Sequence, residues 1–174
     1  MFGLDLLAKL FKILRSEDSP NKIAFGFVMG MIIGLTPLWT IHNLILIVLI
    51  VILRVNIGAS LFGYIIFGML AYVLDPVFHS FGYYLLVDVA VLHGFWARLY
   101  QIPVVALSHY NNTVVIGSLV SSIILFIPVF FAMKYFVVWY RRVVDPKLQK
   151  LRIVQIFKAT KFYRMYEKIK IIGG

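Results

Sequence analysis

The pattern of hydrophobic and polar positions divides the chain into long apolar segments separated by short polar interruptions. The longest segment covers residues 23–53, where 31 consecutive residues carry no formal charge. A bilayer core about 30 Å thick is crossed by about 20 residues of α-helix, so this segment could cross once or enter and return as two shorter helices. Pro37 lies near its centre and lacks a backbone donor. The sequence therefore predicts a helix interruption near Pro37.

Most residues around Pro37 have polar side chains that can satisfy backbone groups freed by an interruption. Irregular backbone at membrane depth is tolerated where it lines a cavity or is buried in protein. We therefore predict that this segment interrupts the helix and lines a path for an amphipathic lipid. The predicted residues are Thr36, Pro37, Trp39, Thr40, His42 and Asn43.

The helix before this interruption is predicted to begin at Pro20, with Ser19 as its N-cap. It has glycine at every fourth position, which places these glycines on one stripe of the helix. They are Gly26, Gly30 and Gly34. We predict that another helix backbone packs closely against this stripe.

Two further apolar segments, residues 57–74 and 113–138, are each long enough to cross a bilayer. Between them, Asp75 followed by Pro76 has the pattern of an N-cap and a first helical residue. The sequence therefore predicts a separate helix from Asp75 to Trp96 or Tyr100.

Ionisable side chains in apolar segments are candidates for function, since each costs at least ~2.5 kcal/mol at the centre of a membrane-spanning helix. His79 and His93 are 14 positions apart, roughly 21 Å along a helix, too far to share a metal ion, so no metal site is predicted. The candidate ionisable membrane residues are Asp75, His79, Asp88 and His93.

Both ends of the chain have amphipathic helical patterns. We predict an interfacial helix over residues 1–18, a membrane domain over 19–142 and a basic cytoplasmic helix over 143–174. The last of these is expected to bind anionic phospholipid at the membrane surface. Its lipid-contacting residues would be Lys150, Lys161, Arg164 and Lys168.

Composition favours an all-α integral membrane protein, because 62% of the residues are hydrophobic and only 14% are charged, against roughly 25% charged in soluble domains. The net charge of +10 arises from basic residues concentrated near the two ends, which predicts cytoplasmic termini and membrane lipids, not nucleic acid, as partners. The number of crossings is then even, either four or two, the latter with residues 22–53 and 76–110 re-entrant. No cysteine and no clustered carboxylates are present, so we expect neither an enzyme nor a cofactor.

Several residues keep the order and spacing of a known pattern: Ser19-Pro20, Ile23-Ala24, Gly26, Gly30, Gly34, Pro37-Leu38-Trp39 and Arg54-Val55-Asn56. Over about residues 19–90 the chain resembles a bacterial membrane family catalogued as domain of unknown function twenty sixty-two. It departs from that pattern at Thr40 and His42, where relatives usually have Gly and Gln, and at Asp75, where Asn is common. The resemblance implies a two-gene pair whose other product is a large envelope protein, and it implies no established activity.

These observations lead to one expected function and two alternatives. We expect a multi-pass component of the bacterial inner (cytoplasmic) membrane that passes an amphipathic lipid, or hands it to a large envelope partner. The first alternative is a scaffold that anchors the larger protein without transporting anything. The second is an ion- or solute-coupled transporter. An oligomer is compatible with each of them.

Overall fold

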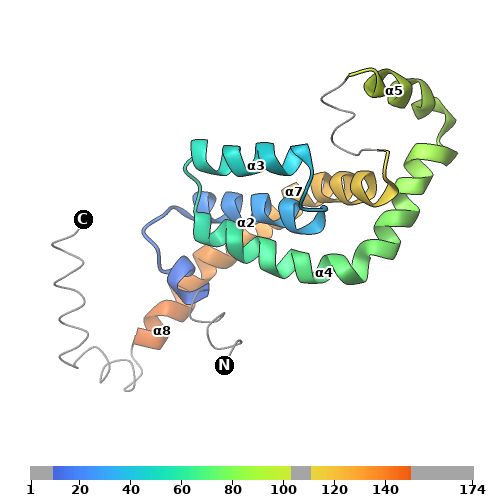
Figure 1. The fold of residues 1–174 in the computed structure, drawn as a ribbon. Helices are drawn as coiled ribbons and strands as arrows, with labels where there is room; N and C mark the ends of the chain where they lie inside the picture. The colour runs from blue at the N-terminus through green and yellow to red at the C-terminus, as the bar shows by residue number, and fades with distance from the viewer. Residues whose placement is uncertain (1–9, 103–110, 150–174) are drawn as a thin grey trace.

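The computed structural model describes residues 10–102 and 111–149, and these are all-α apart from turns and loops (Figure 1). Residues 10–14 form a short helical turn. The α-helices that follow are α2 (Pro20–Leu35), α3 (Ile41–Ile52), α4 (Ile57–Tyr83), α5 (Ala90–Tyr100), α7 (Thr113–Trp139) and α8 (Asp145–Gln149). The π-helical turns are η1 (Tyr84–Asp88) and η2 (Tyr140–Val144). The predicted all-helical class is confirmed.

Helix α2 forms the centre of the bundle and packs against both α4 and α7. Twelve of its sixteen residues are buried, whereas only Asn43 and Ile50 are buried in the twelve-residue α3, which therefore lies on the outside. At 1.5 Å per residue, α2 is about 24 Å long and α3 about 18 Å, both shorter than a bilayer core of ~30 Å. Neither helix reaches the length of a full crossing.

The predicted boundaries of α2 are confirmed. The Ser19 hydroxyl accepts a hydrogen bond from the Lys22 backbone N–H at 3.3 Å, and Pro20 is the first helical residue. The helix ends at Leu35 and α3 begins at Ile41, so the predicted interruption around Pro37 is present.

Two continuous helical segments are long and apolar enough to cross a membrane. They are Ile57–Asp88, made of α4 and η1, and Thr113–Lys147, made of α7, η2 and the start of α8. Asparagine caps both of them, because Asn56 Oδ1 accepts from the Ala59 N–H at 2.7 Å and Asn112 Oδ1 from the Val114 N–H at 2.9 Å. The two crossing-length helices predicted from the sequence are therefore present.

The prediction that a separate helix begins at Asp75 is wrong, because α4 continues through Pro76 to Tyr83. An internal proline removes one intrahelical hydrogen bond, a loss that long apolar helices tolerate when they pack against neighbours. Here the second half of α4 packs on α7, where Gly82 lies directly against the Thr113 carbonyl. Asp75 is therefore a mid-helix residue and not an N-cap.

The predicted continuation of this helix to Tyr100 is also wrong. The chain leaves helical geometry at Val89, where φ is −86° and ψ is 86°, and α5 then starts a new direction (Figure 1). Side chains of α5 bind carbonyls of η1: Trp96 Nε1 donates to Leu85 O at 3.0 Å and His93 Nε2 lies 2.9 Å from Val87 O. These contacts stabilise the bend.

Two groups of predictions lie outside the described residues. The first is residues 1–9, half of the N-terminal helix predicted over residues 1–18. The second is the basic helix after residue 149, with its four lipid-contacting residues Lys150, Lys161, Arg164 and Lys168.

Candidate functional site

Asn43 organises the interruption between α2 and α3. Its side chain is fully buried, and Nδ2 donates to Pro37 O at 2.9 Å and to Leu38 O at 3.4 Å. Thr36 Oγ1 lies 3.0 Å from Asn43 Oδ1 and 2.8 Å from Ile32 O, so its one proton is shared between two acceptors. The Pro37 and Leu38 carbonyls of the loop are thus satisfied within the protein.

Thr40 and His42 form a second set of contacts at the start of α3. Thr40 Oγ1 donates to Pro37 O at 3.1 Å and lies 2.9 Å from His42 Nε2. Because the hydroxyl proton is used by Pro37 O, the geometry fits the His42 tautomer that carries its proton on Nε2. These two side chains therefore stabilise the loop, because they contact each other and the Pro37 carbonyl.

The outer side of the interruption is apolar. Trp39 is 92% exposed and Leu38 is 43% exposed, whereas Thr36, Thr40 and Asn43 are buried beneath them. A loop of a water-soluble protein usually has the opposite arrangement. Polar groups inside and apolar groups outside are what a loop at membrane depth requires.

A groove of about 420 Å³, called here the break groove, lies between the interruption and α4. The end of α2 and the loop form one wall, α4 forms the other, and α7 contributes one residue. The lining residues are Ile33, Gly34, Leu35, Thr36, Pro37, Leu38, Tyr64, Ile65, Gly68, Met69, Ala71, Tyr72, Asp75 and Val114.

A second cavity of about 420 Å³ lies on the other side of the loop, and Leu38 lines both. Trp39 and Thr40 line this second cavity. Of the predicted path residues, His42 and Asn43 line neither of the two. Four of the six predicted residues therefore line a cavity, and the other two, His42 and Asn43, support the loop.

The ionisable residues singled out from the sequence are not gathered at one place. Asp75 lines the break groove together with Thr36 and Pro37. His79 Nδ1 lies 2.7 Å from Thr113 Oγ1, and His93 contacts η1 as described. Among the residues that the structure describes, no group of three His, Asp or Glu side chains could hold a metal ion.

Sequence reasoning missed the α4 wall of the groove. Tyr64, Gly68 and Tyr72 recur at a spacing of four, which places them on one face of a continuous helix. This spacing is the signal that could have identified the wall.

The glycine stripe determines how closely α2 approaches α4. A Cβ atom added at Gly26 would lie 2.5 Å from Asn56 O, and one at Gly34 would lie 2.7 Å from Tyr64 O. At Gly30 the added atom would overlap the Ser60 carbonyl. Backbone therefore packs on backbone along the stripe, and Gly34 lies at the break groove.

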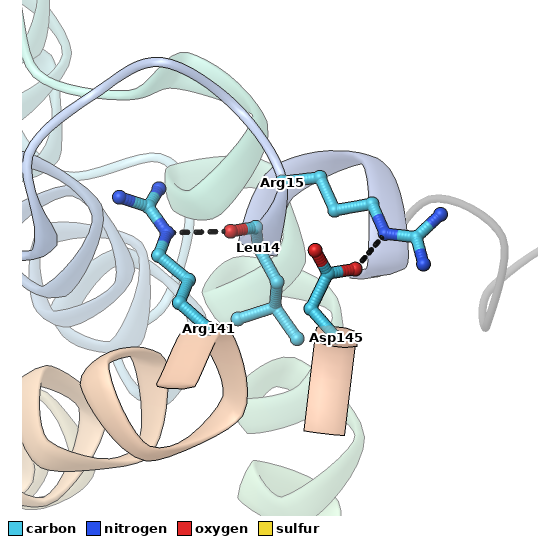
Figure 2. A network of polar contacts seen from close by, with 4 residues as sticks. All are labelled: Leu14, Arg15, Arg141 and Asp145. Carbon is cyan, nitrogen blue, oxygen red and sulfur yellow. Dashed lines mark hydrogen bonds and ion pairs between the residues drawn. The ribbon is translucent and has the colours of Figure 1, made fainter. Parts of the chain in front are cut away.

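The opposite end of α2 is held by a polar joint between the N-terminal segment and the residues that follow α7, in η2 and α8 (Figure 2). Arg141 donates to three carbonyl oxygens, those of Leu14 at 2.8 Å, Ser16 at 2.7 Å and Asp18 at 2.9 Å. Arg15 forms an ion pair with Asp145. Partial burial by itself would lower the pKa of Arg15, but the hydrogen bond and charge of Asp145 outweigh it and raise that pKa.

Asn56 connects the same joint to α4. Its Nδ2 donates to Asp18 Oδ2 at 2.7 Å, and its backbone N–H donates to Lys22 O at 3.4 Å. The joint therefore fixes the N-terminal segment, α4 and α7 relative to one another, and α2 lies between the joint and the break groove.

A family model described as "Uncharacterized protein conserved in bacteria (DUF2062)" matches residues 6–144. The chain belongs to this family. The family match contains the interruption, helices α4 and α7, and all of the polar joint except Asp145, and it extends beyond the resemblance seen over residues 19–90. A relative from Treponema pallidum (strain Nichols), itself described as an uncharacterized protein, is 26% identical over 147 residues, which is 84% of this chain and 90% of the relative. No solved structure matches the chain.

Proposed function

We propose that this DUF2062 protein is an inner-membrane component of a bacterial envelope lipid-transport system. In this proposal α2 and α3 form a re-entrant hairpin, while α4 and α7 cross the bilayer. An amphipathic lipid enters the break groove beside the interruption. From there it passes between leaflets or to a large envelope partner.

The lengths and surfaces of the helices support a re-entrant hairpin. Both α2 and α3 are shorter than a bilayer core, and they are joined by a loop with an exposed tryptophan. The outer face of α3 carries apolar side chains, including Leu44 at 62% and Ile52 at 67% exposure. Such a face is stable in hydrocarbon and unfavourable in water.

The charge distribution supports an orientation with both termini in the cytoplasm. The segments that meet at the polar joint carry seven basic residues, Lys12, Arg15, Lys22, Arg54, Arg141, Arg142 and Lys147, against three acidic residues, Glu17, Asp18 and Asp145. The positive-inside rule places such an end at the cytoplasmic surface. The interruption, at the far end of α2, then lies within the membrane.

The observation that carries the proposal is the break groove, which puts an interrupted helix next to a crossing helix. If water and lipid head groups reach the interruption, single cysteines at Thr36 and Leu38, which line the break groove, and at Thr40, which lines the second cavity, should react with a small water-soluble thiol reagent. The native chain has no cysteine. Labelling is measured by mass shift on the purified protein in lipid vesicles.

Ile45 and Val48 provide matched controls for this labelling. They are 53% and 48% exposed on α3 but do not line the break groove, so cysteines there should face lipid tails and stay unmodified. Equal labelling at all five positions would show a hairpin in water, and no labelling at any of them would show a closed groove. Either result contradicts the proposal.

The scaffold alternative is supported by α5, which extends away from the bundle formed by α2, α4 and α7 (Figure 1). Val91 is 89% exposed and Phe95 is 52% exposed on this helix. Two exposed apolar side chains on a projecting helix can contact another protein. In this alternative the break groove has no role in the activity.

Filling the groove distinguishes the two functions. Met69 lines the break groove and is 66% exposed, while its neighbour Leu70 is 44% exposed and does not line it. We expect Met69→Trp to reduce phospholipid movement between vesicle leaflets at least fivefold and Leu70→Trp to leave it unchanged. Leaflet exchange of a fluorescent phospholipid measures this. Equal rates for the native protein and both variants would favour the scaffold.

A further inference from the structure

Asp75 is an acidic residue within the 32-residue helical segment Ile57–Asp88, which is apolar enough to cross a membrane. Asp75 lies about 27 Å along α4 from Ile57, at 1.5 Å per residue, and it is exposed. The structure places Asp75 in the wall of the break groove, opposite the end of α2 and the loop. The Asp75 carboxylate is therefore accessible to a ligand that enters the groove.

No basic residue compensates this carboxylate inside the groove. The fourteen lining residues include no Lys, Arg or His, and Asp75 is the one acid among them. Within residues 10–102 and 111–149, Asp75 has neither an ion pair nor a hydrogen bond from its side chain. The groove is thus a negatively charged site that is open to a cationic group from outside.

The remaining lining shows what kind of cationic group fits. Ile65 and Met69 give the α4 wall an apolar surface, and the side chains of Tyr64 and Tyr72 supply two hydroxyl groups. Met69 is 66% exposed and Tyr72 is 85% exposed, so the groove opens toward the surrounding lipid. A ligand there would combine a charged head with an acyl tail.

We propose that the break groove binds the head group of a phospholipid with a primary ammonium, and that Asp75 determines this selectivity. The inference rests on the proposed lipid-transport function and names its substrate class. The ammonium N–H groups donate to the Asp75 carboxylate, a charge-assisted hydrogen bond. The acyl chains remain along the apolar α4 wall. A head group with no cation leaves the carboxylate unpaired and binds more weakly.

The test uses full-length protein in mild detergent with an equimolar mixture of phosphatidylethanolamine and phosphatidylglycerol of identical acyl chains. Native mass spectrometry gives the ratio of the two bound lipids. We expect the native protein to prefer phosphatidylethanolamine about tenfold, the effect of one charge-assisted hydrogen bond of roughly 1.4 kcal/mol. In Asp75→Asn, which keeps the shape and loses the charge, the ratio should fall to about one.

Asp88 provides the matched control, because it belongs to the same apolar segment and does not line the groove. Asp88→Asn should keep the native ratio, and Asp75→Glu should restore most of it. Phosphatidylcholine, whose quaternary ammonium has no N–H, should compete less well than phosphatidylethanolamine. Thermal unfolding of each variant in the same detergent identifies any variant that fails to fold. If Asp75→Asn fails to fold, the lipid ratio of the native protein is compared with that of Asp75→Glu.

Three outcomes would overturn the inference. One is the same ratio in the native protein and Asp75→Asn, which would mean that the Asp75 carboxylate does not contact the head group. Another is an equal loss in Asp88→Asn, which would indicate a general effect of helix charge. The third is a preference for phosphatidylglycerol in the native protein. Cysteine labelling of the groove is independent of all three, so its success would leave the proposed function standing while the role of Asp75 is rejected.

Discussion

Gly30→Leu is expected to abolish the native packing of α2 on α4, and Gly30→Ala is expected to lower the free energy of unfolding by about 3 kcal/mol. A Cβ at Gly30 would overlap the Ser60 carbonyl and lie 2.9 Å from the Tyr64 backbone nitrogen. Backbone atoms cannot rotate aside as a side chain can, so the helices must separate. Thermal unfolding in detergent measures the loss.

Gly68 provides the control for this prediction, because it lies in the same helix pair but has space. A Cβ at Gly68 would meet only Gly34 O, at 3.8 Å, which is an ordinary contact. Gly68→Ala should therefore be neutral or slightly stabilising, since alanine has the higher helix propensity. If Gly30→Ala and Gly68→Ala unfold at the same temperature, the close contact between α2 and α4 is not present in the folded protein.

Arg141→Ala is expected to detach the N-terminal segment from the end of α7 and to cost about 2–3 kcal/mol. Three carbonyl groups, those of Leu14, Ser16 and Asp18, lose their donor at once. Hydrogen bonds that involve a charged group contribute about 1.5–3 kcal/mol each, and partial exposure of this site reduces the total. Thermal unfolding reports the cost, and limited proteolysis near Ser16 reports the detachment.

Arg142 is the matched control, because it is the adjacent arginine and is exposed. Arg142→Ala should change neither stability nor cleavage. Arg141→Lys keeps the charge but lacks the guanidinium fork that reaches several acceptors, so it should recover only part of the loss. Full recovery by lysine would mean that charge alone, and not the carbonyl contacts, holds the joint.

Local signals in the sequence were sufficient for the helix boundaries that depend on neighbouring residues. Ser19 with Pro20 marked the start of α2, and Pro37 among threonines marked its interruption. The same kind of signal failed at Asp75 with Pro76, because an Asp-Pro pair fits both a helix start and the interior of a packed helix. The packing of α4 on α7 decides whether a helix starts or continues at this pair. A pattern of neighbouring residues carries no information about that packing.

The candidate site was only partly accessible from the sequence for the same reason. Thr36 and Pro37 were identified because they are next to one another. Their proximity to Asp75 and Tyr64 results from the crossing of α2 and α4, which depends on glycine contacts along the length of α2, from Gly26 to Gly34. The contacts of Arg141 with the carbonyl groups near Leu14 were not predictable from the sequence. Every residue has a backbone carbonyl, so the residue types near Leu14 do not mark these groups as hydrogen-bond acceptors.

The polar joint has a consequence for the order in which the molecule assembles. Leu14 and Arg141 are separated by 127 positions, so this contact cannot form until nearly the whole described chain has been synthesised. Until then α2, the most buried helix, lacks α7 as a neighbour. In the proposed re-entrant arrangement, the hairpin of α2 and α3 would enter the bilayer before α7 has been made, and α7 would then complete the bundle around α2.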